Sequence, residues 1–412
     1  MITSHPDLTI PNQISSNIQN TLQQNENIDS MVCGMRFTNP RTANTVLDKL
    51  LSSTTNYSVP DLGSNGLVAT VMYRTKSINP LKSSYDPDQL KQSSQQSDPP
   101  SDTVCGPGIS STCIESFKCL VSSLMLNDDA PVLTFFQRFL DRPTCPLVVE
   151  LTSRFFNHKI QNLSKLGTHK LIHEFEDTWN VDIIFQAGTV FRRYPRLVCF
   201  DMDSTLIQEE LIDLIAESIG VKAEVSTLTE KAMNGELDFL ESLKLRVKLL
   251  KGIDEDIFTK LQGLITPTKG VKNLIVALKK IGVRTAVFSG GFLPTVSWLA
   301  GELGIDYVHA NILSISDGRF TGELEGEVVN AERKRTLLYE IAKNESININ
   351  QTVAVGDGAN DLLMLGAAGL GVAWNAKSFV RKQVQAKLNR ESLLDLLYLF
   401  GFTAEEISSL SS

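Results

Sequence analysis

Apolar residues in the second half of the chain gather in short runs, and each run is followed by a stretch with helical periodicity. The runs are RLVCF (196–200), RTAVF (284–288), TVAVG (352–356) and GLGVAW (369–374). Strands that alternate with helices are typical of a parallel sheet covered by helices on both faces. The pattern therefore predicts a doubly wound α/β domain over residues 191–412.

A long insertion separates the first two of these runs. About 80 residues lie between them, far more than a crossover connection needs, and most of this span has helical periodicity. An insertion that begins directly after a strand predicts a helical cap, at about residues 206–264, over the carboxyl end of that strand. In open α/β sheets, ligands bind at this end.

The first half of the chain, residues 1–190, has a weaker pattern. GLVATVMYR (66–74) alternates like a strand, and the part after residue 112 looks mainly helical, with one strand at VDIIF (181–185). Between them, Ser77–Thr112 is rich in Ser, Pro, Gln and Asp and has few apolar residues to offset the entropy of ordering. We predict a small α+β domain that a disordered segment interrupts at about residues 77–112.

Composition places the chain among ordinary globular proteins. Its 412 residues are 42% hydrophobic and 21% charged, which suits two or three domains with cores of their own. A net charge of -8 argues against a nucleic-acid partner, because such proteins need a basic surface. No apolar run approaches the roughly 18 residues of a membrane helix, so we expect no membrane partner.

The start of the chain and its cysteines predict the compartment. Residues 1–25 are polar and lack the basic and apolar regions of a secretory signal. The six cysteines show no CxxC spacing, and we interpret them all as free thiols of a reducing compartment. These features predict a cytoplasmic protein. A homodimer is compatible with the sequence, which does not determine the oligomeric state.

Two acidic motifs directly follow predicted strands. DMDST places Asp201 and Asp203 after the first strand, and GDGAND places Asp357 and Asp361 after the third. Alone, the first motif is equally a turn that caps the next helix, and the glycine-rich turn of the second is only moderate evidence for a site, because such turns often do no more than turn. Together they predict a site for a hard cation such as Mg²⁺, with Asp201 as a nucleophile and Asp203 as a general acid.

Two further motifs suit a phosphate ligand. SGGF offers the Ser289 hydroxyl and the backbone of Gly290 just before a helix that begins near Leu293, and such groups bind phosphate oxygens. The motif is equally a simple helix cap. Lys334, in the basic run ERKRT, would by itself be an ordinary surface lysine. Its interpretation depends on the other motifs.

In this order, the four motifs resemble the haloacid dehalogenase superfamily. The cap sequences EELIDLIAESIGV (209–221) and KAMNGELDFLESLKLRV (231–247), with ITPTKG (265–270), are similar to the phosphoserine phosphatases within it, and the resemblance runs from about Arg196 to Leu388. It implies a core of the Rossmann type with Mg²⁺ as cofactor. It also implies hydrolysis of O-phosphoserine to serine and phosphate through a phospho-aspartyl intermediate, the last step of serine biosynthesis.

The resemblance also implies roles for the motif residues. Asp201 would be the nucleophile and a metal ligand, and Asp203 the general acid and base whose backbone carbonyl also binds Mg²⁺. Asp357 would complete the protein ligands. Ser289 and Gly290 would bind the phosphoryl oxygens, and Asn360 would lie near the phosphate. Lys334 would offset the negative charge of the nucleophile and the phosphate. Asp361 would contact the metal ligands without binding the metal itself.

The cap residues would recognise the serine part of the substrate. By the same resemblance, Glu210 would bind the ammonium group and Arg246 the carboxylate, which a guanidinium matches with two parallel hydrogen bonds. The apolar sides of Met233 and Phe239 would exclude water from the closed site.

Several alternatives remain open at this point. Glu and Arg on cap helices are usually just solvated, and the substrate could be another small phosphorylated metabolite, or the reaction a phosphoryl transfer to an alcohol. A regulatory scaffold with an inactive phosphatase fold is a different class, against which the occupied catalytic positions argue. The first half of the chain is either an amino-acid-sensing module that resembles the ACT fold or an inert extension.

Overall fold

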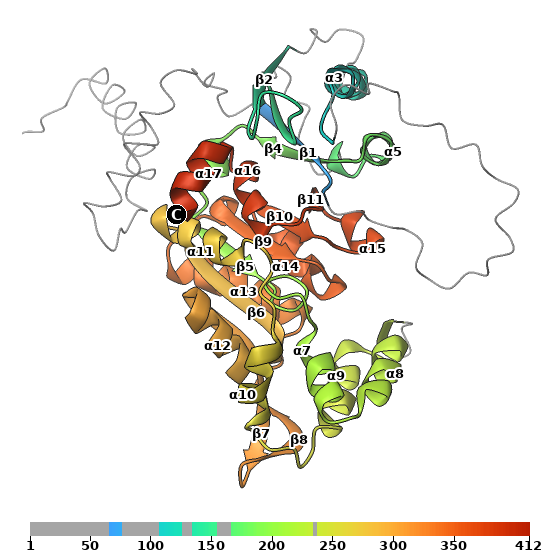
Figure 1. Ribbon diagram of the computed structural model, residues 1–412, viewed down its shortest axis with the longest axis vertical. Coiled ribbons are helices and arrows are strands. Elements are labelled where there is room, and N and C mark those ends of the chain that lie inside the picture. The colour runs from blue at the N-terminus through green and yellow to red at the C-terminus, as the bar shows by residue number, and fades with distance from the viewer. Residues whose placement is uncertain (1–65, 76–106, 126–133, 155–165, 234–236) are drawn as a thin grey trace, which may run out of the picture.

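The computed structural model describes residues 66–75, 107–125, 134–154, 166–233 and 237–412, whose strands form two sheets. One sheet has the strand order β11-β10-β9-β5-β6-β7-β8, and the other has the order β2-β3-β1-β4. Figure 1 shows the larger sheet in the middle of the molecule, the smaller sheet at one end and the helices α8 and α9 at the other.

The larger sheet contains all four strands predicted in the second half of the chain. Its strands are β5 (Leu197–Phe200), β6 (Arg284–Phe292), β7 (Tyr307–Ser316), β8 (Arg319–Glu325), β9 (Thr352–Gly356), β10 (Leu370–Trp374) and β11 (Ala386–Leu388). Neighbouring strands pair in parallel, except for the antiparallel hairpin β7–β8. The predicted α/β fold with a mostly parallel sheet is therefore confirmed.

Helices cover both faces of this sheet because its strands are apolar on both faces. In β5, Leu197 and Cys199 belong to one buried cluster and Val198 and Phe200 to another, as alternating side chains of a strand must. The cluster of Val198 and Phe200 is covered by α11 (Val271–Lys280), α12 (Leu293–Leu303) and α17 (Ala404–Ser411). The cluster of Leu197 and Cys199 is covered by α13 (Ala331–Asn344) and α14 (Leu362–Ala367).

Short elements complete the larger domain. They are η5 (Ile349–Gln351), η6 (Ala359–Asp361), α15 (Ser378–Arg381), η7 (Leu393–Asp395) and α16 (Leu396–Leu399). Among the described helices, none has both the length and the apolar character needed to cross a bilayer.

The insertion between β5 and β6 is helical, as predicted. It contains α7 (Leu211–Ser218), α8 (Lys222–Met233), α9 (Phe239–Lys248), α10 (Ile257–Leu261) and η4 (Gln262–Leu264). A capping box starts α9, because the Asp238 side chain accepts from the Glu241 amide at 2.7 Å and Glu241 accepts in return. The two connections to the sheet run side by side, with Ile207 bridged to Pro267.

The smaller sheet has two strands that the sequence pattern missed. Its elements follow the order β1 (Gly66–Tyr73), α3 (Ser111–Met125), β2 (Phe135–Phe139), β3 (Val148–Arg154), α5 (Lys170–Trp179) and β4 (Val181–Ala187). All pairings are antiparallel, which gives a ferredoxin-like arrangement. The expectation of one strand after residue 112 is wrong, since β2 and β3 precede β4.

The predicted disordered segment falls mostly on residues 77–106, outside the described part of the chain. Its predicted end at residue 112 is too late, because Ile109 is buried and α3 begins at Ser111. The division of the chain into domains at residue 190 stays a prediction. In the structure, the four-residue helix α6 (Val190–Arg193) links the two sheets at this point.

The expectation that every cysteine is a free thiol is wrong. Cys113, Cys119 and Cys199 are free, but Cys145 is part of a disulfide. The remaining two cysteines lie outside the described residues.

Candidate active site

Asp201 stands at the carboxyl end of β5 and is held on two sides. Its amide donates to the Val355 carbonyl of β9 at 2.9 Å, so the residue continues the sheet by one position. Its Oδ1 accepts from the Met202 amide at 2.7 Å and lies 2.7 Å from Nζ of Lys334. The side chain is therefore fixed at the edge of the sheet, where ligands of this fold bind.

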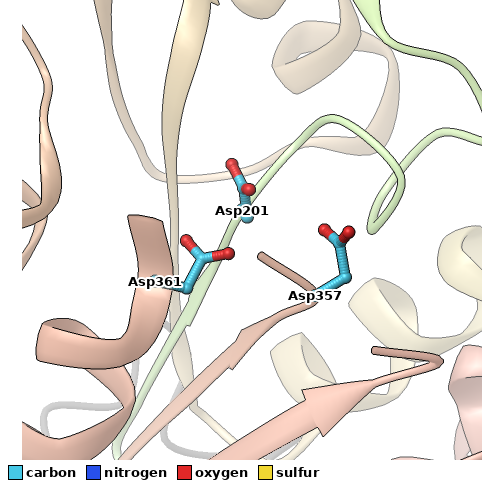
Figure 2. Close-up of side chains that lie close together, drawn as sticks. All are labelled: Asp201, Asp357 and Asp361. Carbon is cyan, nitrogen blue, oxygen red and sulfur yellow. The ribbon is translucent and has the colours of Figure 1, made fainter. Parts of the chain in front are cut away.

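Asp357 and Asp361 reach the same place from the end of β9. Because β5 and β9 are parallel neighbours, their carboxyl ends meet at one edge, and Figure 2 shows the three carboxylates gathered there. Oxygens of Asp201, Asp357 and Asp361 lie within 4.8 Å of one another. Gly356 makes this approach possible, since a Cβ at that position would lie 2.4 Å from Cγ of Asp361.

Lys334 is the cation of this cluster. Asn330 caps α13 by accepting from the Arg333 amide at 2.8 Å, which places Lys334 in the first turn, fully buried. Its Nζ lies 2.8 Å from Oδ1 of Asp361 as well as beside Asp201. The other Asp361 oxygen accepts from the Gly358 amide at 3.1 Å, so both Asp361 oxygens are occupied.

The carboxylates outnumber the cation, and their pKa values reflect this. Burial, followed by the charges of Asp201 and Asp361, raises the pKa of Asp357 to about 8. Burial and Asp201 raise the pKa of Asp361 to about 7. Burial alone would lower the pKa of Lys334, but Asp201 and Asp361 outweigh it and raise that pKa. A bound divalent cation would relieve this excess of negative charge.

Asp203 has an oxygen without a partner. The Leu211 amide donates to its carboxyl group, but Oδ1 is buried and has no hydrogen-bond partner among the described residues. Burial, then Glu210 and Asp201, raise the pKa of Asp203 well above its usual range. A buried carboxyl group of this kind is suited to carry a proton and to donate it.

The SGG loop lies beside Asp203. Strand β6 runs through Ser289 to Phe292, and α12 begins at Leu293, as predicted. Ser289 is fully buried, and its Oγ accepts from the Gly291 amide at 2.8 Å. A Cβ at Gly291 would lie 3.6 Å from Oδ2 of Asp203, so the loop backbone closely approaches that carboxylate.

Glu210 and Arg246 face the cluster from the cap. Glu210 precedes α7, and its Oε1 accepts from the Ser204 hydroxyl at 2.8 Å. Arg246, on α9, is half-buried, and burial lowers its pKa while Asp213, Glu210 and Asp203 act in the opposite direction. The guanidinium therefore lies within electrostatic reach of the acidic site.

Comparisons with known proteins identify the family. Residues 195–369 match the model of the haloacid dehalogenase-like hydrolases. A probable phosphoserine phosphatase of Schizosaccharomyces pombe is 42% identical over 277 residues, which cover 63% of this chain and 93% of that protein. The phosphoserine phosphatase of Saccharomyces cerevisiae is 40% identical over 241 residues, covering 58% of this chain and 78% of that protein. This chain belongs to the phosphoserine phosphatases.

The similarity extends beyond the catalytic half of the chain. The unliganded crystal structure of a probable phosphoserine phosphatase from Vibrio cholerae aligns with a TM-score of 0.56 and 26% identity. The alignment covers 89% of this chain and 95% of that one. The structural likeness to this probable phosphoserine phosphatase therefore extends beyond the part of the chain that forms the larger sheet.

The structure of this phosphatase gathers most of the residues singled out in the sequence. Asp201, Asp203, Ser289, Lys334, Asp357 and Asp361 share the carboxyl edge of the sheet, Glu210 joins them from the cap, and Asn360 lies in η6 between the last two aspartates. The side chains of Met233 and Phe239 lie outside the described part of the structure. The roles of all these residues stay predictions.

Two contacts of the site were not anticipated from the sequence. Thr205 is fully buried and donates to Oδ1 of Asp357 at 3.2 Å. Thr205 belongs to the DMDST motif, so its position in the sequence could have indicated that it lies in the site. Asn311 bonds the SGG loop from β7, and its only signal was a polar residue within an apolar strand.

Proposed function

We propose that this phosphatase hydrolyses O-phosphoserine to serine and phosphate, with Mg²⁺, through a phospho-aspartyl intermediate on Asp201. The observation that carries the proposal is the geometry around Asp201. One of its carboxylate oxygens is held by Lys334, and the residue shares its edge of the sheet with a half-buried Asp203 whose Oδ1 is buried without a hydrogen-bond partner among the described residues. The names of the relatives support phosphoserine as the substrate.

The donor set fits a hard divalent cation. Asp201 and Asp357 would hold it together with the backbone carbonyl of Asp203, since oxygen ligands and a small number of carboxylates suit Mg²⁺. Asp361 is less suited as a ligand, because Lys334 and the Gly358 amide occupy both its oxygens. When bound, the cation would offset the repulsion between the nucleophile and the phosphate dianion.

Asp201 would attack phosphorus with a carboxylate oxygen while Lys334 offsets the charge on the carboxylate and the phosphate. The Ser289 hydroxyl and the Gly290 backbone would hold phosphoryl oxygens, with Asn360 near the phosphate, because phosphoryl transfer depends on positioning and charge compensation.

Asp203 would donate its proton to the departing serine oxygen. It would then take a proton from the water that attacks the acyl phosphate, which releases phosphate and regenerates Asp201. The raised pKa of Asp203 supports a protonated starting state.

The cap would supply recognition of the amino acid. Glu210, oriented by Ser204, would pair with the ammonium group, and Arg246 would bind the carboxylate. Met233 and Phe239 would keep water out of the closed site. Release of free serine from its phosphate ester would make this reaction the last step of serine biosynthesis, for which we propose a cytoplasmic location.

The experiment is a phosphate-release assay across phosphorylated metabolites. We expect phosphoserine to be the best substrate with Mg²⁺, and expect EDTA to abolish turnover until Mg²⁺ is restored. A different preferred ester would favour the alternative of a phosphatase for another metabolite. A phosphate ester formed on an added alcohol, with release of free serine, would favour phosphoryl transfer.

Asp201→Asn tests the nucleophile in the same assay. An amide cannot form the acyl phosphate, so turnover and acid-stable labelling with ³²P-phosphoserine should both be lost. Asp317→Asn is the matched control, because Asp317 lies on the exposed β7–β8 turn at φ 51°, a conformation that Asn tolerates. Normal turnover in Asp201→Asn would refute the covalent mechanism.

A further inference from the structure

Asn311 is a buried polar residue of β7 with no assigned role in the reaction. It is 1% exposed, and its side-chain amide makes two hydrogen bonds to backbone groups of different segments. Nδ2 donates to the Gly290 carbonyl at 2.8 Å, and Oδ1 accepts from the Val329 amide at 2.8 Å. A carbonyl requires a donor and an N–H requires an acceptor, so the two partners fix the orientation of the amide.

The first bond fixes a peptide of the SGG loop. In a trans peptide, the carbonyl of Gly290 and the N–H of Gly291 point in opposite directions. With the carbonyl held by Asn311, the N–H is directed to Oγ of Ser289, which it reaches at 2.8 Å. Two successive glycines have no Cβ to resist rotation of this peptide, so an external anchor is needed to hold it.

The second bond reaches the start of the helix that carries Lys334. Val329 directly precedes Asn330, which caps α13 by accepting from the Arg333 amide at 2.8 Å. Lys334 follows in the first turn of that helix. Asn311 therefore connects the loop that carries Ser289 to the segment from which Lys334 reaches Asp201.

We propose that Asn311 is a positioning residue that sets the SGG loop and the start of α13 in the arrangement required to bind a phosphoryl group. It does not itself touch the substrate. The inference rests on the proposed function, because it takes the SGG loop as the phosphate site. It predicts an effect on the phosphate, which every phosphate ester shares, and none on recognition of the serine part.

Asn311→Ala tests the inference in the full chain with Mg²⁺. We expect kcat/KM to fall by about 10-fold to 100-fold, because the misplacement or loss of one contact to the phosphate typically lowers the rate by such a factor. The factor should be equal for phosphoserine and for an aryl phosphate. Inhibition by inorganic phosphate should weaken as well, an effect that a loss of stability alone does not cause in the folded protein.

Asn180→Ala is the matched control. Asn180 ends α5 in the smaller sheet's domain, and its Nδ2 donates to the Arg74 carbonyl at 3.3 Å. This variant also loses one bond from a side-chain amide to a backbone carbonyl, so it should lower the melting temperature and leave kcat/KM and phosphate inhibition unchanged. Circular dichroism establishes that each variant is folded, and Asn311→Ser replaces Asn311→Ala if the latter is not.

The outcomes separate the two proposals. A folded Asn311 variant with kcat/KM and phosphate inhibition within about twofold of the parent overturns the positioning role and leaves the proposed function intact. A loss confined to phosphoserine also overturns it. If the parent hydrolyses no phosphate ester, the proposed function fails, and calorimetric binding of inorganic phosphate to parent and variant then decides the role of Asn311.

Discussion

Lys334 has no contact with solvent, yet its ammonium group should remain charged. A lysine buried without partners would lose its proton, because desolvation penalises the charged form. Here Asp201 and Asp361 lie 2.7 and 2.8 Å from Nζ, and they raise its pKa despite the burial. Asp361 can approach only because residue 356 is glycine. The positive charge beside the proposed nucleophile is thus built into the fold.

Arg246 tests which group recognises the serine part of the substrate. Arg246→Ala removes the proposed carboxylate partner, so kcat/KM for phosphoserine should fall by a factor equivalent to about 2 to 5 kcal/mol. An aryl phosphate has no such carboxylate, and its kcat/KM should change little. Lys248→Ala removes an exposed cation of the same helix and is the matched control. An equal loss for both substrates would show that Arg246 binds the phosphate or stabilises the fold instead of recognising the carboxylate.

Elements were predictable where their pattern of burial was regular. Strands β5, β9 and β10 are buried at every position, and short apolar runs of this kind stand out in the sequence. Strand β2 could not be found this way, because it is an edge strand on which Phe136 and Phe139 are exposed. In β8, the polar sequence RFTGELE pairs with β7 through backbone groups, which leave no mark in the pattern.

The same reasoning explains which parts of the site were predictable. Parallel strands bring their carboxyl ends to one edge, so aspartates that follow β5 and β9 had to meet. Asn311 was not predictable, because its partners Gly290 and Val329 lie 21 and 18 residues away and are backbone groups. The burial of Lys334 was also unexpected, since only the folded chain brings Asp361 to it.

Strand β3 carries an ion-pair cluster that predicts a pH dependence of stability. Glu150 is buried and lies 2.9 Å from Arg138 and 2.7 Å from Arg192 of α6. Burial would raise the pKa of Glu150, but the two arginines outweigh it and lower that pKa. Its contribution to stability is then present above the pKa of the unfolded chain and is lost as the pH falls through the lower pKa of the folded state.

Glu150→Gln measures this contribution by urea unfolding at several pH values. At pH 7 the variant should be less stable by about 3 to 5 kcal/mol, because it removes the buried carboxylate that pairs with two partly buried arginines. The difference should shrink as the pH falls below about 4.5, where Glu is protonated in the unfolded chain. Glu115→Gln, in an exposed pair with Lys118, is the control and should change little. A pH-independent difference would contradict the ion-pair explanation.

The two sheets of the molecule share buried surface. Met72, Val148 and Ile184 of the smaller sheet belong to the same apolar cluster as Phe400 of the larger domain. Polar contacts join them too, since Lys387 of β11 lies 2.6 Å from Glu176 of α5. The smaller sheet and α5 therefore cover a surface of the larger domain at the end opposite the cap helices α8 and α9 (Figure 1).

A chain that starts at Thr189 should keep the chemistry and lose stability. The proposed catalytic, metal, phosphate and cap residues lie between Asp201 and Asp361, so turnover of phosphoserine per folded molecule should be retained. The truncation uncovers apolar side chains such as Phe400, and burial of each such side chain contributes about 1.5 to 3 kcal/mol to the free energy of unfolding. With roughly 2 to 4 °C per kcal/mol for a domain of this size, the melting temperature should fall by about 10 °C.

The measurements are phosphate release, melting by circular dichroism and light scattering, because newly exposed apolar surface favours aggregation. A chain that starts at Gly66 keeps the smaller sheet and controls for shortening alone. Unchanged stability after truncation at Thr189 would contradict the shared core. A folded but inactive truncated chain would show that the first half completes the active site. We do not expect this, because the described residues show no contact between the smaller sheet and the cap.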